Sequence, residues 1–312
     1  MGISLEIQQR REFSLTNFHG SGKAPFFEGW YFKLQNAAQT VALIPGISAD
    51  EDGNQAAFVQ VITDTGSCCF YFPVSRCVFP QKHRFCKIGD NIFSSKGIHL
   101  ELMNNKVQIR GTIRFGDFTL PAYPAMGPFS IFPFMQCNHE VISLRHSLSG
   151  TVEINGRLLE FQGGVGYIEK DWGNSFPKEY LWVHSNSFLN AAASIMVSVA
   201  DIPFFGFHFY GCIGVVYING REYRMATYTG VKILRCGSHG VTLKQGKYLL
   251  RIDVFTQNAH LLYSPKQGKM SGTIRESPSC RARFRFYEGD RLLLDEVSTQ
   301  TGFEFVLDKE NA

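Results

Sequence analysis

The sequence predicts an all-β protein with two barrel-like halves. Short runs in which apolar and polar residues alternate recur along the chain, and Gly, Asn, Asp and Pro bound them, as is typical of antiparallel strands. Two of these boundaries are Asn155-Gly156 and Asn219-Gly220, whose residues tolerate the positive φ that a two-residue hairpin turn requires. No long run shows the spacing of an amphipathic helix.

The remaining elements extend this pattern. Glu288-Gly289-Asp290 predicts a third hairpin, and the run 194–199 favours a strand. A Glu-to-Trp element opens each half, at 28–30 and again at 169–172, which indicates a duplication. Two tandem lipocalin-like antiparallel β-barrels would satisfy the pattern, because closure removes exposed strand edges and can leave room for one apolar ligand.

The expected join between the halves lies at the glycines 163 and 164. We expect a first barrel-like domain over 1–163, which includes an N-terminal extension, and a second over 164–312. The proline-rich segment 121–133 is expected to form a loop over a barrel mouth.

The composition is that of a globular protein with an excess of aromatic residues. Of the 312 residues, 44% are hydrophobic, 19% are charged and 14% are aromatic, with 28 Phe. This excess fits a Phe-rich core and a lined apolar cavity equally well. The net charge of +4 is small, and Arg281, Arg283 and Arg285 alternate with other residues as on a solvated strand, so nucleic acid is not an expected partner.

Motifs for metals, nucleotides and export are missing from the sequence. The eight Cys form no Cys-x-x-Cys pair, the nine His form no His-x-x-x-His pair, and there is no phosphate loop or Gly-x-Ser-x-Gly elbow, so neither a metal nor a cofactor is expected. Residues 1–20 lack an apolar signal core, and no run approaches the length of a membrane span. We therefore expect a cytoplasmic protein with reduced thiols and no transmembrane segment.

The most informative feature is a pair of aromatic-acidic signatures. The first, at 26–32, would place Phe26, Glu28, Trp30 and Phe32 on one face of a strand. Apolar burial would raise the pKa of Glu28, and the carboxyl could act as a general acid or orient a ligand. The alternative is a buried ion pair with an Arg from another strand, which would only stabilise the barrel.

The second signature, at 163–177, contains two carboxyls. A strand here places Tyr167, Glu169 and Asp171 on one face and Trp172 on the other. Two carboxyls on one face should raise the pKa of one of them, which would keep a proton available at neutral pH. The alternative is that Asp171 caps a turn while Glu169 pairs with a cation.

A third stretch, at 180–188, alternates aromatic and uncharged polar residues, a pattern that can hold an apolar ligand and orient its polar head. His139, in a shorter alternation upstream, is a further lining candidate, although a lone His is more often structural. The residues expected to line the ligand site are Trp30, Tyr31, Tyr167, Trp172, Trp182, His184, Asn186, Phe188 and His139.

These signatures resemble the tocopherol cyclase family. The resemblance rests on Phe27-Glu28-Gly29-Trp30-Tyr31-Phe32 and on Tyr167-Ile168-Glu169-Lys170-Asp171-Trp172-Gly173-Asn174-Ser175-Phe176-Pro177. Further matches are Gly127-Pro128-Phe129, Met135-Gln136-Cys137-Asn138-His139, Trp182, Asn186 and Phe188. Plant members of the family carry Asn at the position of Asp171, which favours Glu169 as the proton donor.

The resemblance implies a cofactor-independent enzyme that closes a chromanol ring on a prenylated quinol. An acid protonates the nearest prenyl double bond, the phenolic oxygen captures the tertiary carbocation, and a base collects the phenolic proton. The three tryptophans of the chain would stabilise the cation, and the apolar substrate would be collected by transient contact with a membrane. The expected catalytic residues are Glu169, as the leading acid, Glu28 and Asp171.

Two other functions fit the same residues. Paired barrels can also carry or sense an apolar isoprenoid, because a fold alone does not decide function. The same acid could equally serve an isoprenoid hydratase or isomerase. Ring closure leaves the mass of the substrate unchanged, whereas hydration adds one water and a carrier forms no product.

Overall fold

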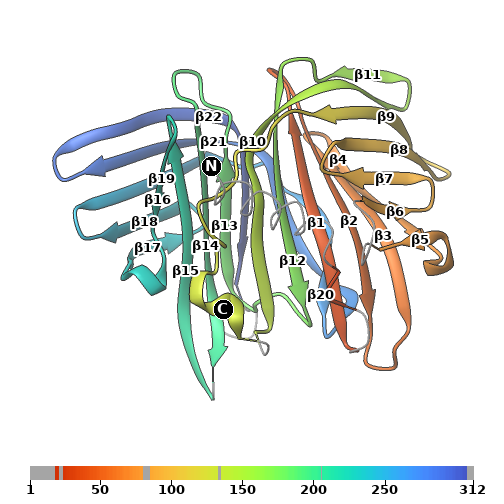
Figure 1. The fold of residues 1–312 in the computed structure, drawn as a ribbon, viewed down its shortest axis with the longest axis horizontal. Helices are drawn as coiled ribbons and strands as arrows, with labels where there is room; N and C mark the ends of the chain where they lie inside the picture. The colour runs from red at the N-terminus through yellow and green to blue at the C-terminus, as the bar shows by residue number, and fades with distance from the viewer. Residues whose placement is uncertain (1–17, 21–23, 80–84, 133–134, 205, 308–312) are drawn as a thin grey trace, which may run out of the picture.

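The computed structural model describes residues 18–20, 24–79, 85–132, 135–204 and 206–307. Within these residues the chain forms two antiparallel sheets and three short 3-10 helices, and Figure 1 shows the sheets side by side. The predicted all-β class is confirmed. The predicted N-terminal extension lies largely outside the described residues.

The first sheet contains twelve described strands, hydrogen-bonded in the order β4-β3-β2-β1-β12-β10-β9-β8-β7-β6-β5, with β11 beside β10. These strands are β1 (Phe26–Gln35), β2 (Thr40–Ala49), β3 (Gln55–Thr63), β4 (Gly66–Phe72), β5 (Cys77–Val78), β6 (Phe85–Ile88), β7 (Asn91–Ser94), β8 (Gly97–Met103), β9 (Gln108–Phe115), β10 (Cys137–Ile154), β11 (Arg157–Glu160) and β12 (Gly164–Gly173).

The second sheet contains ten described strands in the order β16-β15-β14-β13-β22-β21-β19-β18-β17, with β20 beside β21. These strands are β13 (Tyr180–Ser185), β14 (Ala193–Phe204), β15 (Phe207–Ile218), β16 (Arg221–Arg224), β17 (Lys232–Gly237), β18 (Gly240–Gln245), β19 (Tyr248–Thr256), β20 (His260–Lys266), β21 (Lys269–Glu288) and β22 (Arg291–Val306). The 3-10 helices are η1 (Val74–Arg76), η2 (Gly127–Ile131) and η3 (Thr227–Thr229).

The three predicted hairpins are present. Asn155-Gly156 joins β10 to β11 and Asn219-Gly220 joins β15 to β16, with φ between 47° and 87° at all four residues. Gly289, at φ 60°, lies in the turn between β21 and β22. Positive φ at these positions is what Asn and Gly adopt at low cost, so local turn chemistry sets the register of these strand pairs.

The two sheets repeat one topology. In each, the first strand pairs with the last, β1 with β12 and β13 with β22. In each, the two end strands are consecutive in the chain and are linked by a 3-10 helix, η1 between β4 and β5 and η3 between β16 and β17. The expected duplication therefore has a counterpart in the strand topology. The Glu-to-Trp element at 169–172 lies in the last strand of the first sheet and does not open the second half.

The change from one sheet to the other comes later than residue 163. Strand β12 is buried between β1 and β10, because the turn at Gly163 returns the chain into the first sheet, where the Gly163 amide bonds to the carbonyl of Leu148. The chain then crosses to the second sheet over residues 174–179. A domain boundary at 163/164 would cut the first sheet before its last strand.

Neither sheet is a closed hydrogen-bonded barrel in the described residues. The two paths are open, and η1 and η3 connect their end strands through the backbone instead of a ladder. In the first sheet the end strand β5 contributes only two residues, both paired with β6, and is too short to bond along β4. The prediction of two complete barrels is corrected to two curled sheets.

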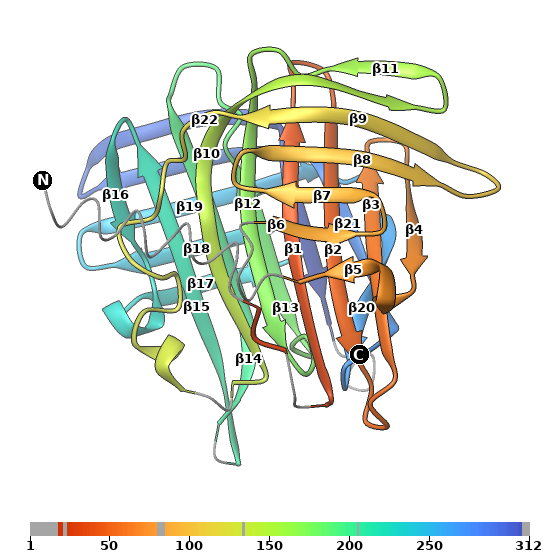
Figure 2. The ribbon, with the colours of Figure 1, turned by 45° about the vertical axis from the view of Figure 1, so that its right-hand side comes forward.

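Each sheet encloses its own core, and a third core joins the sheets. Figure 2 shows β7 to β9 passing in front of β1 to β3, and side chains from both groups pack together, among them Phe32 and Phe93. A second cluster fills the curl of the second sheet around Phe284 and Phe286. The third cluster lies between the sheets and includes Tyr31 and Trp182.

Candidate active site

A cavity of about 180 Å³ lies between the two sheets. Most of its wall is apolar and aromatic, and the segment predicted to cover a barrel mouth contributes Met126 and Phe129, while its last residue, Pro133, lies outside the described residues. Four carboxyls and one imidazole also reach the wall. They are His139, Glu169 and Asp171 from the first sheet and Glu276 and Glu304 from the second.

Glu169 is the central carboxyl of the first wall. Strand alternation on β12 directs Tyr167, Glu169 and Asp171 away from the core of the first sheet, as the sequence predicted. Glu169 is 5% exposed, and its Oε2 accepts hydrogen bonds from Tyr167 Oη at 2.5 Å and from Trp182 Nε1 at 3.2 Å. Trp182 belongs to the second sheet, so the carboxyl is held from both sides of the cavity.

The pKa of Glu169 is raised from 4.5 to about 7. Burial is the largest cause, and the charge of Asp171 adds to it, whereas His139 and the hydrogen bonds from Tyr167 and Trp182 oppose it. A carboxyl that titrates near neutrality can release and regain a proton under the same conditions, which suits a general acid.

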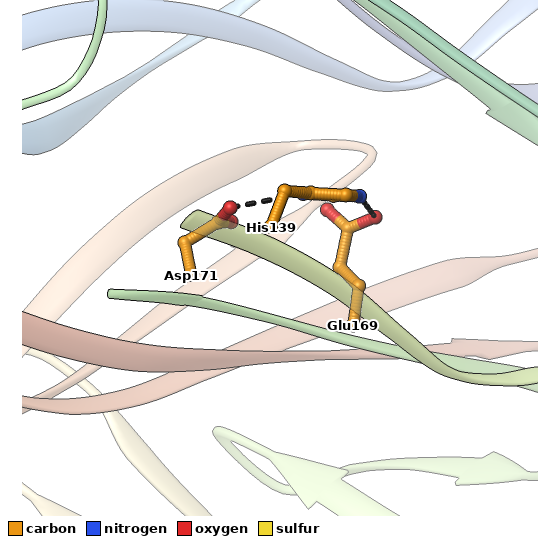
Figure 3. A group of neighbouring side chains, drawn as sticks. All are labelled: His139, Glu169 and Asp171. Carbon is orange, nitrogen blue, oxygen red and sulfur yellow. Dashed lines mark hydrogen bonds and ion pairs between the residues drawn. The ribbon is translucent and has the colours of Figure 1, made fainter. Parts of the chain in front are cut away.

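His139 joins the two carboxyls of this wall. Figure 3 shows its ring between Asp171 and Glu169, with Nδ1 2.9 Å from Asp171 Oδ1 and Nε2 3.6 Å from Glu169 Oε2. Burial opposes the charged form of the ring, but the two carboxylates outweigh it and raise the pKa of His139 to about 9. Asp171 therefore orients an imidazolium and does not cap a turn, which was the alternative for this residue.

These three residues are also the ones that could hold a metal ion, since one ligand atom from each lies within 4.8 Å of the others. The two ring nitrogens of His139, however, point to different carboxylates, at 2.9 and 3.6 Å. The contact with Asp171 is a hydrogen bond, and the contact with Glu169 is an ion-pair distance, so each ring nitrogen faces a different carboxylate. The geometry fits a proton relay better than a shared ion.

Glu28 proves to be an ion-paired carboxylate. Its Oε1 lies 2.5 Å from Lys170 Nζ, and its Oε2 accepts the backbone amides of His19 and Gly20 at 2.7 and 3.1 Å. Burial alone would raise the pKa of Glu28, but the His19 hydrogen bond and the Lys170 charge outweigh it and lower the pKa. The expected protonated acid is therefore not found, and the buried ion pair is, with Lys in the place of the predicted Arg.

Trp30 and Trp172 hold a cation already. Lys170 Nζ lies 4.9 Å from the ring centre of Trp30 and 5.4 Å from that of Trp172, and His19 stacks on Trp172 at 4.3 Å. Trp172 does not reach the cavity wall, whereas Trp30 does. Of the three tryptophans, Trp182 is the one whose face is not engaged by a lysine among the described residues.

Only part of the stretch 180–188 lines the cavity in the way that the sequence predicted for its alternate residues. Tyr180 and Trp182 reach the cavity, while His184 stacks on Tyr167 at 3.6 Å and Asn186 donates to the carbonyls of Leu144 and Gly166 across the sheets. Strand β13 ends at residue 185, so the alternation stops before 188. The last predicted member of this face, Phe188, packs against Phe284 inside the second sheet.

Sequence reasoning missed the second pair of carboxyls. Glu276 and Glu304 are direct cross-strand neighbours on β21 and β22. Glu276 accepts a hydrogen bond from Tyr31 at 2.5 Å, and Glu304 accepts one from Tyr180 at 2.5 Å. The available signal was Phe303-Glu304-Phe305, a carboxylate between two aromatic rings, as in the first signature. Glu276 has no such signal.

The fold and the cavity define a class of protein. It is a two-sheet β protein whose sheets enclose an apolar, aromatic cavity with buried carboxyls on both walls. A model of the tocopherol cyclase-like family matches residues 81–305, and the chain belongs to that family.

Two curated relatives carry names from this family. A probable chloroplastic tocopherol cyclase of Oryza sativa subsp. japonica is 29% identical over 86 residues, which cover 28% of this chain and 18% of the rice protein. A chloroplastic tocopherol cyclase of Zea mays is 23% identical over 177 residues, which cover 54% of this chain and 34% of the maize protein. The matches thus span about a third or less of these relatives.

Solved structures share the fold at low identity. CghA in complex with Sch210972 superposes with a TM-score of 0.59 at 9% identity, covering 91% of this chain and 89% of CghA. Kievitone hydratase from Nectria haematococca superposes with a TM-score of 0.53 at 12% identity, covering 96% of each chain. None of the described helices has the length and apolar character needed to cross a membrane.

Proposed function

We propose that this protein is a cofactor-independent cyclase that closes a chromanol ring on a prenylated quinol, with Glu169 as the proton donor. The observation that carries the proposal is the environment of Glu169, a buried carboxyl at an apolar cavity whose pKa is raised to about 7. Membership of the tocopherol cyclase-like family supports an apolar, prenylated substrate.

Each demand of the reaction has a counterpart in the cavity. Glu169 supplies the proton that converts the prenyl double bond into a tertiary carbocation. Aromatic faces near the carboxyl, those of Tyr31 and Trp182, which meet edge to face at 5.4 Å, stabilise the cation. The apolar wall excludes the water that would otherwise end the reaction as an alcohol.

The roles of the neighbours follow from their contacts. His139 and Asp171, whose side chains are 12% and 23% exposed, connect Glu169 to solvent and return a proton to it after each turnover. Tyr167 and Trp182 fix the carboxyl, and His184 supports Tyr167 from behind. Glu28 is assigned to stability and not to chemistry.

The test uses prenylated quinols in deuterated water. We expect a product of unchanged mass, apart from the isotope, with altered retention and one solvent deuterium on carbon. Glu169→Gln keeps the shape but removes the proton, so turnover should fall by a factor on the order of 10²–10⁴ while ligand affinity changes by less than about tenfold. The matched control is Glu153→Gln, a half-buried carboxyl of the same sheet that pairs with Arg110 outside the cavity.

Other outcomes identify the rival functions. Normal turnover by Glu169→Gln would exclude this mechanism. Quenching of Trp182 fluorescence by the quinol without any product would favour a carrier, whose lipocalin-like sheets would hold the ligand unchanged. A product heavier by one water would identify a hydratase.

A further inference from the structure

We propose that Glu276 and Glu304 form a second proton-transfer site on the opposite wall of the cavity, in which Glu276 accepts the proton that the phenolic head loses during ring closure. This inference rests on the proposed function and completes it. In a cyclase that used Glu169 alone, one carboxyl would have to give a proton to the alkene and take the phenolic proton on the same wall, whereas Glu276 offers a separate acceptor on the opposite wall.

The pair is buried and built into two long strands. Glu276 is fully buried and Glu304 is 9% exposed, and both reach the cavity wall. Tyr31 Oη donates to Glu276 Oε1 and Tyr180 Oη donates to Glu304 Oε2, each at 2.5 Å. No described donor meets Glu276 Oε2. Two fixed carboxyls with one unmatched oxygen form a site that can take a proton.

The second wall repeats the arrangement of the first. In the first sheet Glu169 lies on the last strand, β12, and in the second sheet Glu276 lies on β21, which pairs with the last strand, β22. The first strand of each sheet, β1 or β13, carries an aromatic hydrogen-bond donor. Tyr31 of the first sheet donates to Glu276 of the second, and Trp182 of the second sheet donates to Glu169 of the first. The same topology therefore delivers one hydrogen-bonded carboxyl to each side of the bound molecule.

The charges of the pair leave one proton on it at neutral pH. Burial, followed by the charge of Glu276, raises the pKa of Glu304 well above its ordinary value, so Glu304 holds the proton. Burial also raises the pKa of Glu276, to about 7, although the hydrogen bond from Tyr31 and the charge of Lys33 oppose the rise. Glu276 therefore gives up its proton more readily than Glu304 and is the member of the pair that serves as the acceptor.

Further charges face this pair from other strands. Glu169 and Asp171 on β12 both act on Glu304, and Lys33 on β1 acts on Glu276. Lys33 is buried and donates to the carbonyl of Gln300 at 2.9 Å, and although burial lowers its pKa to about 8, it is still mostly charged at neutral pH. This cation stabilises the single negative charge before the phenolic proton arrives.

Ring closure adds the phenolic O–H group across the prenyl double bond, and each wall of the cavity handles one of the two proton transfers. Glu169 gives its proton to the less substituted carbon of the double bond nearest the ring, so the π bond becomes a C–H bond and the neighbouring carbon becomes a tertiary cation. The phenolic oxygen forms the new C–O bond as its O–H bond breaks, and that proton passes to Glu276. Glu169 ends ionised and Glu276 ends protonated, and exchange with solvent restores both, so the reaction is proton-neutral.

Turnover in deuterated water separates the two carboxyls. In Glu276→Gln the alkene is still protonated but the cation returns to substrate, so recovered quinol should gain deuterium while product formation falls at least about a hundredfold. In Glu169→Gln neither label nor product should form. Glu296→Gln, on the same strand as Glu304 but bonded to Asn190 outside the cavity, should behave as the unchanged protein. Tyr31→Phe, which removes only the donor, should give the Glu276→Gln pattern in milder form.

Normal product formation by Glu276→Gln, or loss of both label and product, would overturn the inference. A second measurement needs no substrate. Infrared spectra of the free protein at neutral pH should lose one protonated-carboxyl band in Glu304→Gln and keep it in Glu296→Gln, while Glu169→Gln should lose a different band, that of Glu169 itself. If no band is lost in Glu304→Gln, the pair holds no proton and the inference fails. If the unchanged protein cyclises no prenylated quinol, the proposed function fails, while the infrared result still decides the state of the pair.

Discussion

Glu28 and Glu169 lie on adjacent paired strands, each buried among aromatic rings, and yet their pKa values move in opposite directions. Glu28 faces the core of the first sheet, where Lys170 reaches it at 2.5 Å. Glu169 faces the second sheet, where its closest donors are the neutral groups of Tyr167 and Trp182. The difference teaches that aromatic burial does not by itself make an acid. The decisive factor is how closely a cation approaches the carboxyl and whether it is shared. Lys170 lies 2.5 Å from Glu28, whereas His139 lies 3.6 Å from Glu169 and closer, at 2.9 Å, to Asp171.

The largest effect that would test this comparison comes from removing the cation of the Glu28 pair. Lys170→Met leaves Glu28 buried without its counter-ion, and unfolding should become easier by about 3–5 kcal/mol in denaturant titrations. The double variant Glu28→Gln/Lys170→Met should recover most of this loss and keep turnover within about tenfold of the unchanged protein. A double variant that folds but is inactive would show that the Glu28–Lys170 pair is needed for the reaction and not only for stability.

The pH dependence of stability sharpens the contrast. The folded state holds a proton on Glu169 up to pH about 7, against 4.5 for an ordinary Glu, so its contribution to stability is present at low pH and is lost as the pH rises between these values. The loss is on the order of 3 kcal/mol at most. Glu28, whose pKa is lowered, contributes in the opposite sense and loses its contribution as the pH falls.

The measurement is thermal or denaturant unfolding of the unchanged protein and Glu169→Gln at a series of pH values. The stability of the unchanged protein relative to the variant should decline from pH 4.5 to about 7. A difference that is flat or rises with pH would show that Glu169 is ionised like Glu28.

The smallest expected effect concerns the hydrogen bond that Trp182 donates to Glu169 at 3.2 Å. The bond favours the ionised carboxyl, so Trp182→Phe should raise the pKa of Glu169 further. Since the proton donor must be protonated, the alkaline limb of the pH–rate profile should move up by about one unit. A limb that moves down, or does not move, would assign that limb to another group, with His139 the first to examine.

Local patterns were enough to predict some of these features and not others. The turns at Asn155 and Asn219 and the face shared by Glu169 and Asp171 follow from turn chemistry and strand alternation, which depend on neighbours in the chain. The environment of Glu28 depends on a residue 142 positions away, Lys170, which only the register of β1 against β12 places beside it. Alternation correctly placed Lys170 opposite Glu169, but not against Glu28.

The carboxyl pair on the second wall could not be predicted from neighbouring residues either, because it also depends on contacts between distant parts of the chain. Glu276 and Glu304 meet through the register of β21 with β22, and Tyr31 reaches Glu276 across the interface between the sheets. Open sheet ends and the late crossover at residues 174–179 likewise depend on tertiary packing. The division of the chain into domains at residue 163 and the cytoplasmic location stay predictions.

The repeated topology has a consequence for how such a site can diversify. A two-fold symmetric dimer built from single sheets would present identical walls, and any substitution would appear on both at once. Here each wall is encoded by its own segment of one chain, so His139 and Asp171 can flank the carboxyl of one wall while Lys33 and a second Glu attend the other. Two sheets of similar topology within one chain can thus carry different side chains on the two walls of one cavity.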